Sequence, residues 1–218
     1  MKLWSYWRSS CAYRVRIALG LKGVSYEYAA VHLIRDGGQQ HQPAFGALNP
    51  QRQVPVLEFE ESGQNVRLVQ SMAIIEYLDE RFPDPPLLPK NALDRAHVRA
   101  LAELVNSGIQ PLQNTGTFAE LTRHGVASEP WAKLFIEKGL ASLERLAAPR
   151  AGAFLFGDRA SLADIYLVPQ LYNARRYGVP LDGFPTLTRA ETSAQALPAF
   201  QRARPEAQPD AEIPLPSP

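Results

Sequence analysis

The 218-residue chain contains one cysteine, four histidines and no long apolar run. A single cysteine excludes an internal disulfide, a Cys-X-X-Cys redox pair and a cysteine-based zinc cluster. The histidines lie in different segments, and no two have the i,i+4 spacing of zinc ligands on a helix. These four residues are His32, His41, His97 and His124. We therefore expect a site without metal.

An excess of charge of one sign is also absent. The 23 Lys and Arg balance 22 Asp and Glu to a net charge of +1, so no whole-molecule field attracts nucleic acid or an anionic membrane. No uncharged apolar stretch approaches the roughly 18 residues of a membrane span. The start, Met1–Trp4, lacks the apolar run of a signal peptide. The composition predicts a soluble, cytoplasmic protein with no nucleic-acid or membrane partner.

Proline divides the chain into domains. Four prolines between Pro83 and Pro89 forbid a continuing helix and favour an extended connector. From Pro205 on, five more prolines accompany little apolar material, so we expect no packed structure there. The expected organisation is a domain over residues 1–82, a linker over 83–90, a helical domain over 91–205 and a proline-rich tail over 206–218.

Before the linker, strand and helix patterns alternate. Apolar residues at helical spacing predict helices over 11–22 and 71–81. Segments rich in Val and Tyr predict strands over residues 3–7, 25–31, 54–59 and 66–69. The order β-α-β, a connecting segment and β-β-α predicts a small α/β sheet of about eighty residues.

After the linker, the patterns are all helical. Apolar stripes run between Asn91 and Gly108 and again between Ile136 and Ala147. Ser161 and Asp164 have the spacing of a capping box, in which a hydroxyl and a carboxylate satisfy each other's backbone donors. We interpret this box as a folding element rather than a catalytic pair.

The candidate chemistry lies where the first strand meets the first helix, at Ser9-Ser10-Cys11. A helix N-terminus offers unpaired N–H groups and a positive dipole end, where a hydroxyl can donate to an anion and a thiol is more acidic. The alternative is structural, because serine is a preferred N-cap and a lone cysteine usually behaves as a small hydrophobe. Taken alone, the local sequence favours the structural interpretation.

Two more loops carry candidate features. Pro55 at the opening of a strand removes a ladder donor, so either a cis bond turns the Val54 backbone toward a ligand or the strand lies at an edge. Ser71 either caps the second helix or helps its first N–H groups to hold a carboxylate. In this element order, the three loops converge on one end of the sheet.

The segment SSCAYRVRIAL, Ser9–Leu19, resembles the signature of zeta-class glutathione transferases. Similar segments follow at DGGQQ (36–40), ALNP (47–50), QSMAIIEYL (70–78), GIQPLQN (108–114) and LVPQ (167–170), so the resemblance covers residues 1 to about 205. It implies the glutathione transferase fold, in which an α/β thioredoxin-like domain (βαβ-ββα) precedes an all-α helical-bundle domain. It also implies a homodimer.

The resemblance implies a role for each candidate residue. Ser9, Ser10 and Cys11 would surround the sulfur of glutathione, with Ser10 as hydroxyl donor to the thiolate. The other residues implied to bind glutathione are Gln40 at the glycyl end, Val54 at the cysteinyl backbone, Gln70 and Ser71 at the γ-glutamyl end, and Gln110 and Asn114 from the helical domain. Arg8 and Arg176 would hold the carboxylates of a dianionic substrate. The resemblance is interrupted after Asn114, where Thr115–Thr117 departs from the usual sequence of the class.

Bacterial members of this class are typically maleylacetoacetate isomerases of tyrosine and phenylalanine catabolism. The resemblance therefore implies glutathione-dependent isomerisation of maleylacetoacetate to fumarylacetoacetate, by thiolate addition, bond rotation and elimination. A maleylpyruvate isomerase and a general glutathione transferase are alternatives on the same scaffold. A non-catalytic interaction module is an alternative of another class, although such a module needs neither the hydroxyl turn nor the Gln70-Ser71 pair.

Overall fold

The computed structural model describes residues 1–212 and divides into two compact units. Among the described residues, one unit contains residues 1–85 and 198–212, and the other contains Pro86–Leu197. The short helix after Pro198 therefore packs with the N-terminal unit, whereas the sequence pattern placed residues 198–205 in the helical domain. In the described part of the chain, no helix is both long and apolar enough to cross a membrane.

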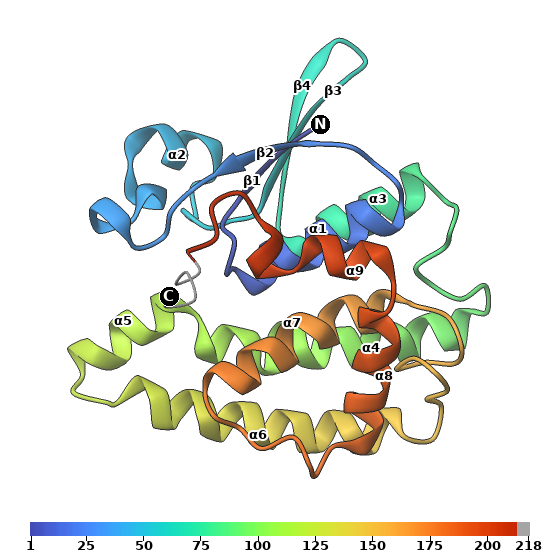
Figure 1. Cartoon of the computed structure of the whole chain (residues 1–218). Coiled ribbons are helices and arrows are strands. Elements are labelled where there is room, and N and C mark those ends of the chain that lie inside the picture. Colours follow the sequence, from blue (N-terminus) through green and yellow to red (C-terminus); the bar gives the residue numbers. More distant parts are fainter. Residues whose placement is uncertain (213–218) are drawn as a thin grey trace, which may run out of the picture. The chain divides into compact units, whose positions relative to one another are not determined.

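A four-stranded mixed sheet is the centre of the first unit (Figure 1). The strands are β1 (Lys2–Ser5), β2 (Glu27–Ala30), β3 (Val56–Glu61) and β4 (Gln64–Val69). In the order β2-β1-β3-β4, β1 is parallel to β2 and antiparallel to β3, and β3 is antiparallel to β4. Leu3 and Leu57 are paired across the two central strands and are fully buried, which places the core at the middle of the sheet.

Four helices and three 3₁₀ turns accompany the sheet in the described part of the first unit. They are α1 (Ser10–Leu21), α2 (Pro43–Leu48), α3 (Ser71–Arg81) and α9 (Pro198–Ala203), with 3₁₀ turns η1 (Arg35–Gly37), η2 (Gln39–His41) and η4 (Pro205–Ala207). Helix α1 contacts both α3 and α9. Gly20 permits the approach of α9, because a Cβ at this position would lie 3.2 Å from the Cβ of Ala199.

The second unit is helical throughout its regular elements. They are α4 (Ala92–Gly108), η3 (Gln110–Gln113), α5 (Thr115–Arg123), α6 (Ser128–Ala147), α7 (Leu162–Arg176) and α8 (Pro185–Gln195). Helix α7 is the central one: ten consecutive residues, Leu162–Leu171, are buried, and the helix contacts α4 and α8. The predicted capping box of Ser161 and Asp164 is present at its start.

The Asp164 carboxylate completes this box inside the protein. It accepts hydrogen bonds from the backbone N–H groups of Leu155 and Ser161, both at 2.8 Å, and from the Ser161 hydroxyl at 2.9 Å. Burial raises the pKa of Asp164 to about 6, and these three hydrogen bonds oppose the rise. Asp164 thus ties the start of α7 to the preceding segment at Leu155, and the box has the structural role that we expected.

The expectation of an unpacked tail from Pro205 onward is wrong for the described residues. Pro205 opens the turn η4, and Gln208 is buried with its amide donating to the carbonyls of Arg202 and Arg204. Composition misled here because proline is well suited to the first position of a helical turn, where no N–H donor is required. Residues 213–218 of the predicted tail lie outside the described residues.

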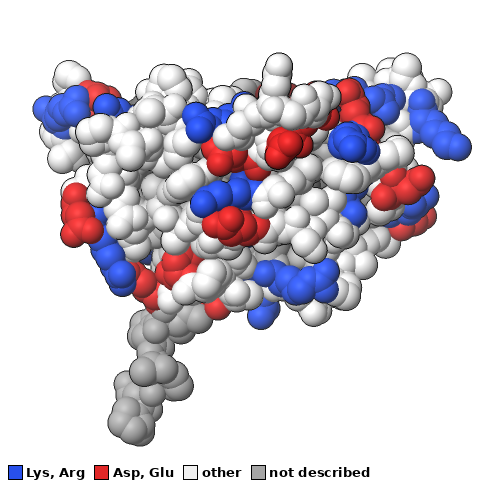
Figure 2. Space-filling model, turned by 90° about the horizontal axis from the view of Figure 1, so that it is seen from above, with Lys and Arg blue, Asp and Glu red and all other residues white. Residues whose placement is uncertain are grey.

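Charge is mixed on the visible surface. Figure 2 shows basic and acidic side chains interspersed on the face that it displays. This pattern agrees with the net charge of +1.

Candidate active site

A tight turn leads from β1 into α1. The strand ends at Ser5, two residues earlier than expected, because the N–H of Ser9 donates to the carbonyl of Tyr6 at 3.0 Å and turns the chain. Ser9 is the N-cap of α1, and its Oγ accepts from the N–H of Ala12 at 3.3 Å. Ser10 and Cys11 follow as the first two helical residues. The capping role therefore falls to Ser9, and Ser10 stands at the positive end of the helix dipole.

Arg14 links this turn to the start of α3. Its side chain is almost fully buried, and its Nη1 donates to the Oγ of Ser71 at 3.2 Å and lies 3.8 Å from the Sγ of Cys11. Two residues predicted to share a site are thus joined by a third that the sequence analysis did not include. The sequence feature that could have identified Arg14 is its position, one helical turn after Cys11 within the Ser9–Leu19 signature.

The second loop is shaped by Asn49 and a cis peptide bond at Val54-Pro55. Asn49 is buried, and its side chain accepts from the N–H of Gln51 at 3.0 Å and donates to the carbonyl of Gln53 at 2.8 Å. Because β3 lies between β1 and β4, the edge-strand alternative for Pro55 is wrong. The cis alternative is the one observed, with Val54 buried at the entry to a central strand.

The third loop ends in an unusual backbone conformation. Gln70, just before α3, has a backbone φ of +71°, which residues other than glycine rarely adopt. Its Nε2 donates to the Oε1 of Gln51 at 2.6 Å, which joins the third loop to the second. Together with the Arg14–Ser71 hydrogen bond, this contact confirms that the three loops converge within the first unit.

Gln40 has an unused hydrogen-bond acceptor. The side chain is buried, and its Nε2 donates to the carbonyl of Leu33 at 3.2 Å, whereas its Oε1 has no partner among residues 1–212. Gly38 leaves room for this side chain, because a Cβ there would lie 2.5 Å from Nε2. A buried carbonyl oxygen of this kind can accept an N–H group of a bound ligand.

Arg8 provides a cation beside the first turn. Its guanidinium lies over the ring of Trp7, 5.3 Å from the centroid, and no carboxylate of residues 1–212 forms an ion pair with it. Burial raises the pKa of Tyr6, and the nearby charge of Arg8 opposes that rise. The positive charge of Arg8 is therefore available to an anionic ligand.

The other three candidates belong to the second unit. Gln110 begins η3, and Asn114 is the N-cap of α5, where its Oδ1 accepts from the N–H of Thr115 at 2.8 Å. Arg176 ends α7 with an exposed side chain, and its Nη1 donates to the Oδ1 of Asn173 at 3.3 Å. The contacts described above join Cys11 to Ser71 through Arg14 and link Gln70 to the second loop, and none of them includes Gln110, Asn114 or Arg176.

Arg175 and Arg176 differ in their partners. Arg175 forms a two-point ion pair with the buried Glu191, with 2.6 Å between Nη1 and Oε1, and this carboxylate raises the pKa of Arg175. Arg176 forms no ion pair with a carboxylate in the described part of the chain. Of the two neighbours, Arg176 is the one able to attract an anion.

Family models match both halves of the chain. Residues 1–80 match the model of the glutathione S-transferase N-terminal domain, and residues 133–203 match that of the C-terminal domain. The chain is 48% identical, over 96% of its length, to maleylacetoacetate isomerase of Pseudomonas aeruginosa, 98% of which is covered. The chain belongs to the glutathione S-transferase family. The predicted fold, an α/β domain followed by a helical domain, is confirmed by these matches.

Two solved structures of this family are also similar. Maleylacetoacetate isomerase from Anaeromyxobacter dehalogenans, with dicarboxyethyl glutathione and citrate in its active site, is 52% identical with a TM-score of 0.88, and 97% of each chain is covered. The holo structure of maleyl pyruvate isomerase, a bacterial glutathione S-transferase in the zeta class, is 44% identical with a TM-score of 0.91. That similarity covers 97% of this chain and 100% of the other. The predicted resemblance to the zeta class is thereby confirmed.

Proposed function

We propose that this glutathione S-transferase catalyses the glutathione-dependent cis–trans isomerisation of maleylacetoacetate to fumarylacetoacetate. The observation that carries the proposal is the joining of the Ser10-Cys11 turn to Ser71 through Arg14, in a chain 48% identical to a maleylacetoacetate isomerase. The bound compound in the A. dehalogenans isomerase supports the chemistry, since addition of the glutathione thiol to an unsaturated four-carbon diacid gives a dicarboxyethyl thioether.

The residues present fit the three parts of glutathione. At the γ-glutamyl end, Gln70 and Ser71 open α3, where helix N–H groups and the Ser71 hydroxyl would receive a carboxylate. At the cysteinyl part, Val54 would pair through its backbone. At the glycyl end, the unpartnered Oε1 of Gln40 would accept a peptide N–H. We propose that Gln110 and Asn114 complete the site from the second unit.

Bound glutathione supplies a nucleophilic sulfur that adds reversibly to the conjugated double bond. The protein must keep this sulfur anionic, since a free thiol has a pKa of about 8.5. We propose that the Ser10 hydroxyl donates to the sulfur, helped by the positive end of the α1 dipole. Ser9 holds the turn as its cap, and Cys11 lies alongside. No residue in the first turn of α1 itself is acidic.

Arg8 and Arg176 would bind the two carboxylates of the diacid by charge-assisted hydrogen bonds. Neither arginine forms an ion pair with a carboxylate of residues 1–212. Such binding fixes both ends of the substrate and stabilises the charge that develops on the carbonyl oxygen during addition.

Maleylpyruvate isomerase activity is the second candidate, favoured by the 44% identity to the zeta-class maleyl pyruvate isomerase. The two activities are separated by measuring kcat/KM for both diacids side by side with saturating glutathione. We expect maleylacetoacetate to be the better substrate by at least about tenfold, a difference of roughly 1.4 kcal/mol in transition-state binding. A preference for maleylpyruvate would establish the second candidate function. Failure to convert either diacid would contradict both activities and favour a non-catalytic interaction module.

We further propose a cytoplasmic homodimer that serves tyrosine and phenylalanine catabolism. The class resemblance supports the dimer and the pathway, and the single cysteine, typical of a reducing compartment, supports the cytoplasm. Light scattering on the purified chain tests the assembly: a mass of twice the 24.2 kDa protomer is expected, and a protomer mass at micromolar concentration would contradict the dimer.

A further inference from the structure

The last described residues lie against the turn that carries the candidate catalytic groups. We call residues Pro205–Glu212 the C-terminal strap; it is drawn in dark red in Figure 1. Within the strap, Asp210 accepts two hydrogen bonds, one at Oδ2 from the backbone N–H of Trp7 at 3.1 Å and one at Oδ1 from the Tyr28 hydroxyl at 2.6 Å. Asp210 therefore holds a peptide group that lies two residues before Ser9.

Two neighbouring contacts fix the end of the strap. Ala211 packs on the apolar cluster that contains Tyr6 and Trp7. Glu212 forms an ion pair with Arg35 and a hydrogen bond with the Nε2 of His32, the latter at 3.1 Å. The Nδ1 of His32 accepts from the N–H groups of Ile34 and Arg35, at 3.2 and 2.8 Å, so Nε2 carries the proton and donates to Glu212.

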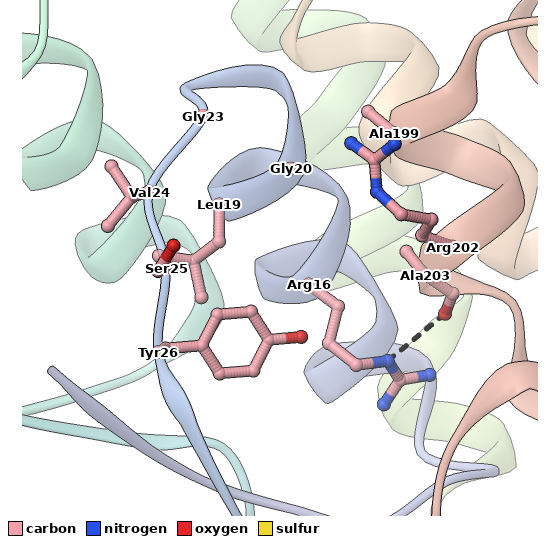
Figure 3. A pocket seen from close by; sticks show the side chains of 10 residues that line it. All are labelled: Arg16, Leu19, Gly20, Gly23, Val24, Ser25, Tyr26, Ala199, Arg202 and Ala203. Carbon is pink, nitrogen blue, oxygen red and sulfur yellow. Dashed lines mark hydrogen bonds between the residues drawn. The ribbon is translucent and has the colours of Figure 1, made fainter.

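Arg16 holds the same turn from the opposite side. Its buried guanidinium donates to the carbonyls of Tyr6 at 3.3 Å and Trp7 at 2.9 Å. Its Nε donates to the carbonyl of Ala203, at the end of α9, at 3.1 Å (Figure 3). The Trp7 residue is therefore bound on both sides of its backbone, through its N–H by Asp210 and through its carbonyl by Arg16.

Figure 3 also shows the pocket beside Arg16, which Tyr26 and Arg202 line as well. None of the candidate site residues lines this pocket. Because the Arg16 donors are directed at protein oxygens, we interpret Arg16 as a clamp for the turn rather than a ligand-binding group.

We propose that Asp210 is a positioning residue, which sets the Trp7–Ser9 backbone so that the Ser10 hydroxyl meets the sulfur of glutathione. The inference rests on the proposed function of this site. A hydrogen bond to a carboxylate is roughly twice as strong as a neutral one, so this contact holds the Trp7 peptide firmly. Misplacement of a catalytic group by about 1 Å can cost about a hundredfold in rate.

Replacement of the Asp210 side chain tests the proposal. Asp210→Ala removes the acceptor of the Trp7 N–H. In Asp210→Asn the amide oxygen can still accept that N–H, while the Tyr28 hydroxyl turns to accept from the amide nitrogen. Glu212→Gln is the matched control, because Glu212 contacts His32 and Arg35 but not the turn.

Two readouts are needed: isomerase kcat and KM, and the ultraviolet absorbance of the thiolate of bound glutathione against pH. For Asp210→Ala we expect a kcat lowered about 10- to 100-fold and a thiolate titration moved to higher pH, with KM for the diacid little changed. For Asp210→Asn and Glu212→Gln we expect kcat and KM within about threefold of wild type and a thiolate titration at the same pH as in wild type. A merely structural role would reduce the active fraction without moving the thiolate titration.

An unchanged titration in Asp210→Ala would overturn the proposal, as would equal losses in Asp210→Ala and Asp210→Asn. If Asp210→Ala does not fold, Tyr28→Phe gives a milder version of the test, since it removes one of the two donors that fix the Asp210 carboxylate. Failure of the proposed function can be distinguished from failure of this proposal. A wild-type protein that binds glutathione as thiolate but converts neither diacid would contradict the isomerase function. The effect of Asp210 on the thiolate titration could still be measured in that protein.

Discussion

Arg14 and Ser71, which are 57 positions apart in the sequence, are joined in the interior of the first unit by a 3.2 Å hydrogen bond between Nη1 and Oγ. Ser71 is the first residue of α3, and Arg14 lies one turn inside α1. The bond therefore fixes the two helix starts to which the sulfur and the γ-glutamyl end of glutathione are assigned. A planar guanidinium suits this bridging, because its donors are held in a rigid fork.

Arg14→Lys should weaken glutathione binding about tenfold, because the shorter lysine side chain cannot place its nitrogen where Nη1 reaches both Ser71 and Cys11. The buried site should also lower the free energy of unfolding by about 1–3 kcal/mol. Calorimetric titration with glutathione and urea denaturation measure the two effects. Arg67→Lys is the control, since Arg67 forms an exposed ion pair with Glu58 on the same unit. Unchanged glutathione affinity in Arg14→Lys would contradict the bridging role.

Gln70→Gly should make the fold more stable while it impairs binding. Glycine adopts a positive φ without the steric cost that Gln70 carries, so the free energy of unfolding should rise by up to about 1 kcal/mol. Loss of the amide should weaken glutathione binding roughly tenfold. Gln51→Ala is the control, because it removes only the exposed partner of the Gln70 side chain. A lower melting temperature in Gln70→Gly would show that the conformation is not strained.

Arg176→Ala and Arg175→Ala should have different effects, although the residues are adjacent. Without Arg176, KM for the diacid should rise about tenfold while glutathione affinity and thermal stability stay unchanged. Without Arg175, the buried Glu191 loses its partner, which should lower the free energy of unfolding by about 1–3 kcal/mol. The smaller values in that range are expected, since half of the Arg175 side chain is exposed. A parallel loss of glutathione binding in Arg176→Ala would place Arg176 outside the substrate site.

Asp164 should give a stability contribution that depends on pH. Its pKa is about 6 in the native protein and about 3.9 in an unfolded chain, so the native state binds the proton more tightly. The contribution is fully present below about pH 4 and is lost as the pH rises through 6. The free energy of unfolding of wild type minus that of Asp164→Asn should therefore fall between pH 4 and 6, by no more than about 3 kcal/mol.

Urea denaturation of the Asp164→Asn variant and wild type at intervals from pH 4 to 8 measures this difference. Asp182→Asn, which changes one exposed carboxyl of the same unit, is the control. A difference that grows with pH would show that the hydrogen bonds from Leu155 and Ser161 outweigh the effect of burial.

Local features of the fold were predictable where sequence pattern and tertiary structure agree. Helix α3 has the predicted bounds, Ser71–Arg81, since Ser71 opens an apolar stripe at helical spacing. The capping box at Ser161 also follows from a short-range signal, and the convergence of the three loops follows from the order of strands and helices. The family resemblance added the expected ligand, which no spacing or composition could identify.

Long-range contacts of polar residues were not predictable. Arg14 and Arg16 are charged, and charged side chains are seldom fully buried, so composition offered no reason to place them in the core. Asp210 lies in a proline-rich segment that reads as unpacked, and its partner Trp7 is 203 positions away. Such pairings depend on the tertiary fold, which no local sequence pattern describes.

The central claim is that the sulfur of glutathione, held at the Ser10 turn, carries the isomerisation. The most direct measurement is conversion of maleylacetoacetate by the purified protein with glutathione, with S-methylglutathione, and with no thiol. We predict turnover with glutathione and none in the other two conditions. Ser10→Ala should lower that turnover by about a hundredfold or more without loss of folded protein. Equal conversion with S-methylglutathione, which has no ionisable thiol, would contradict the account.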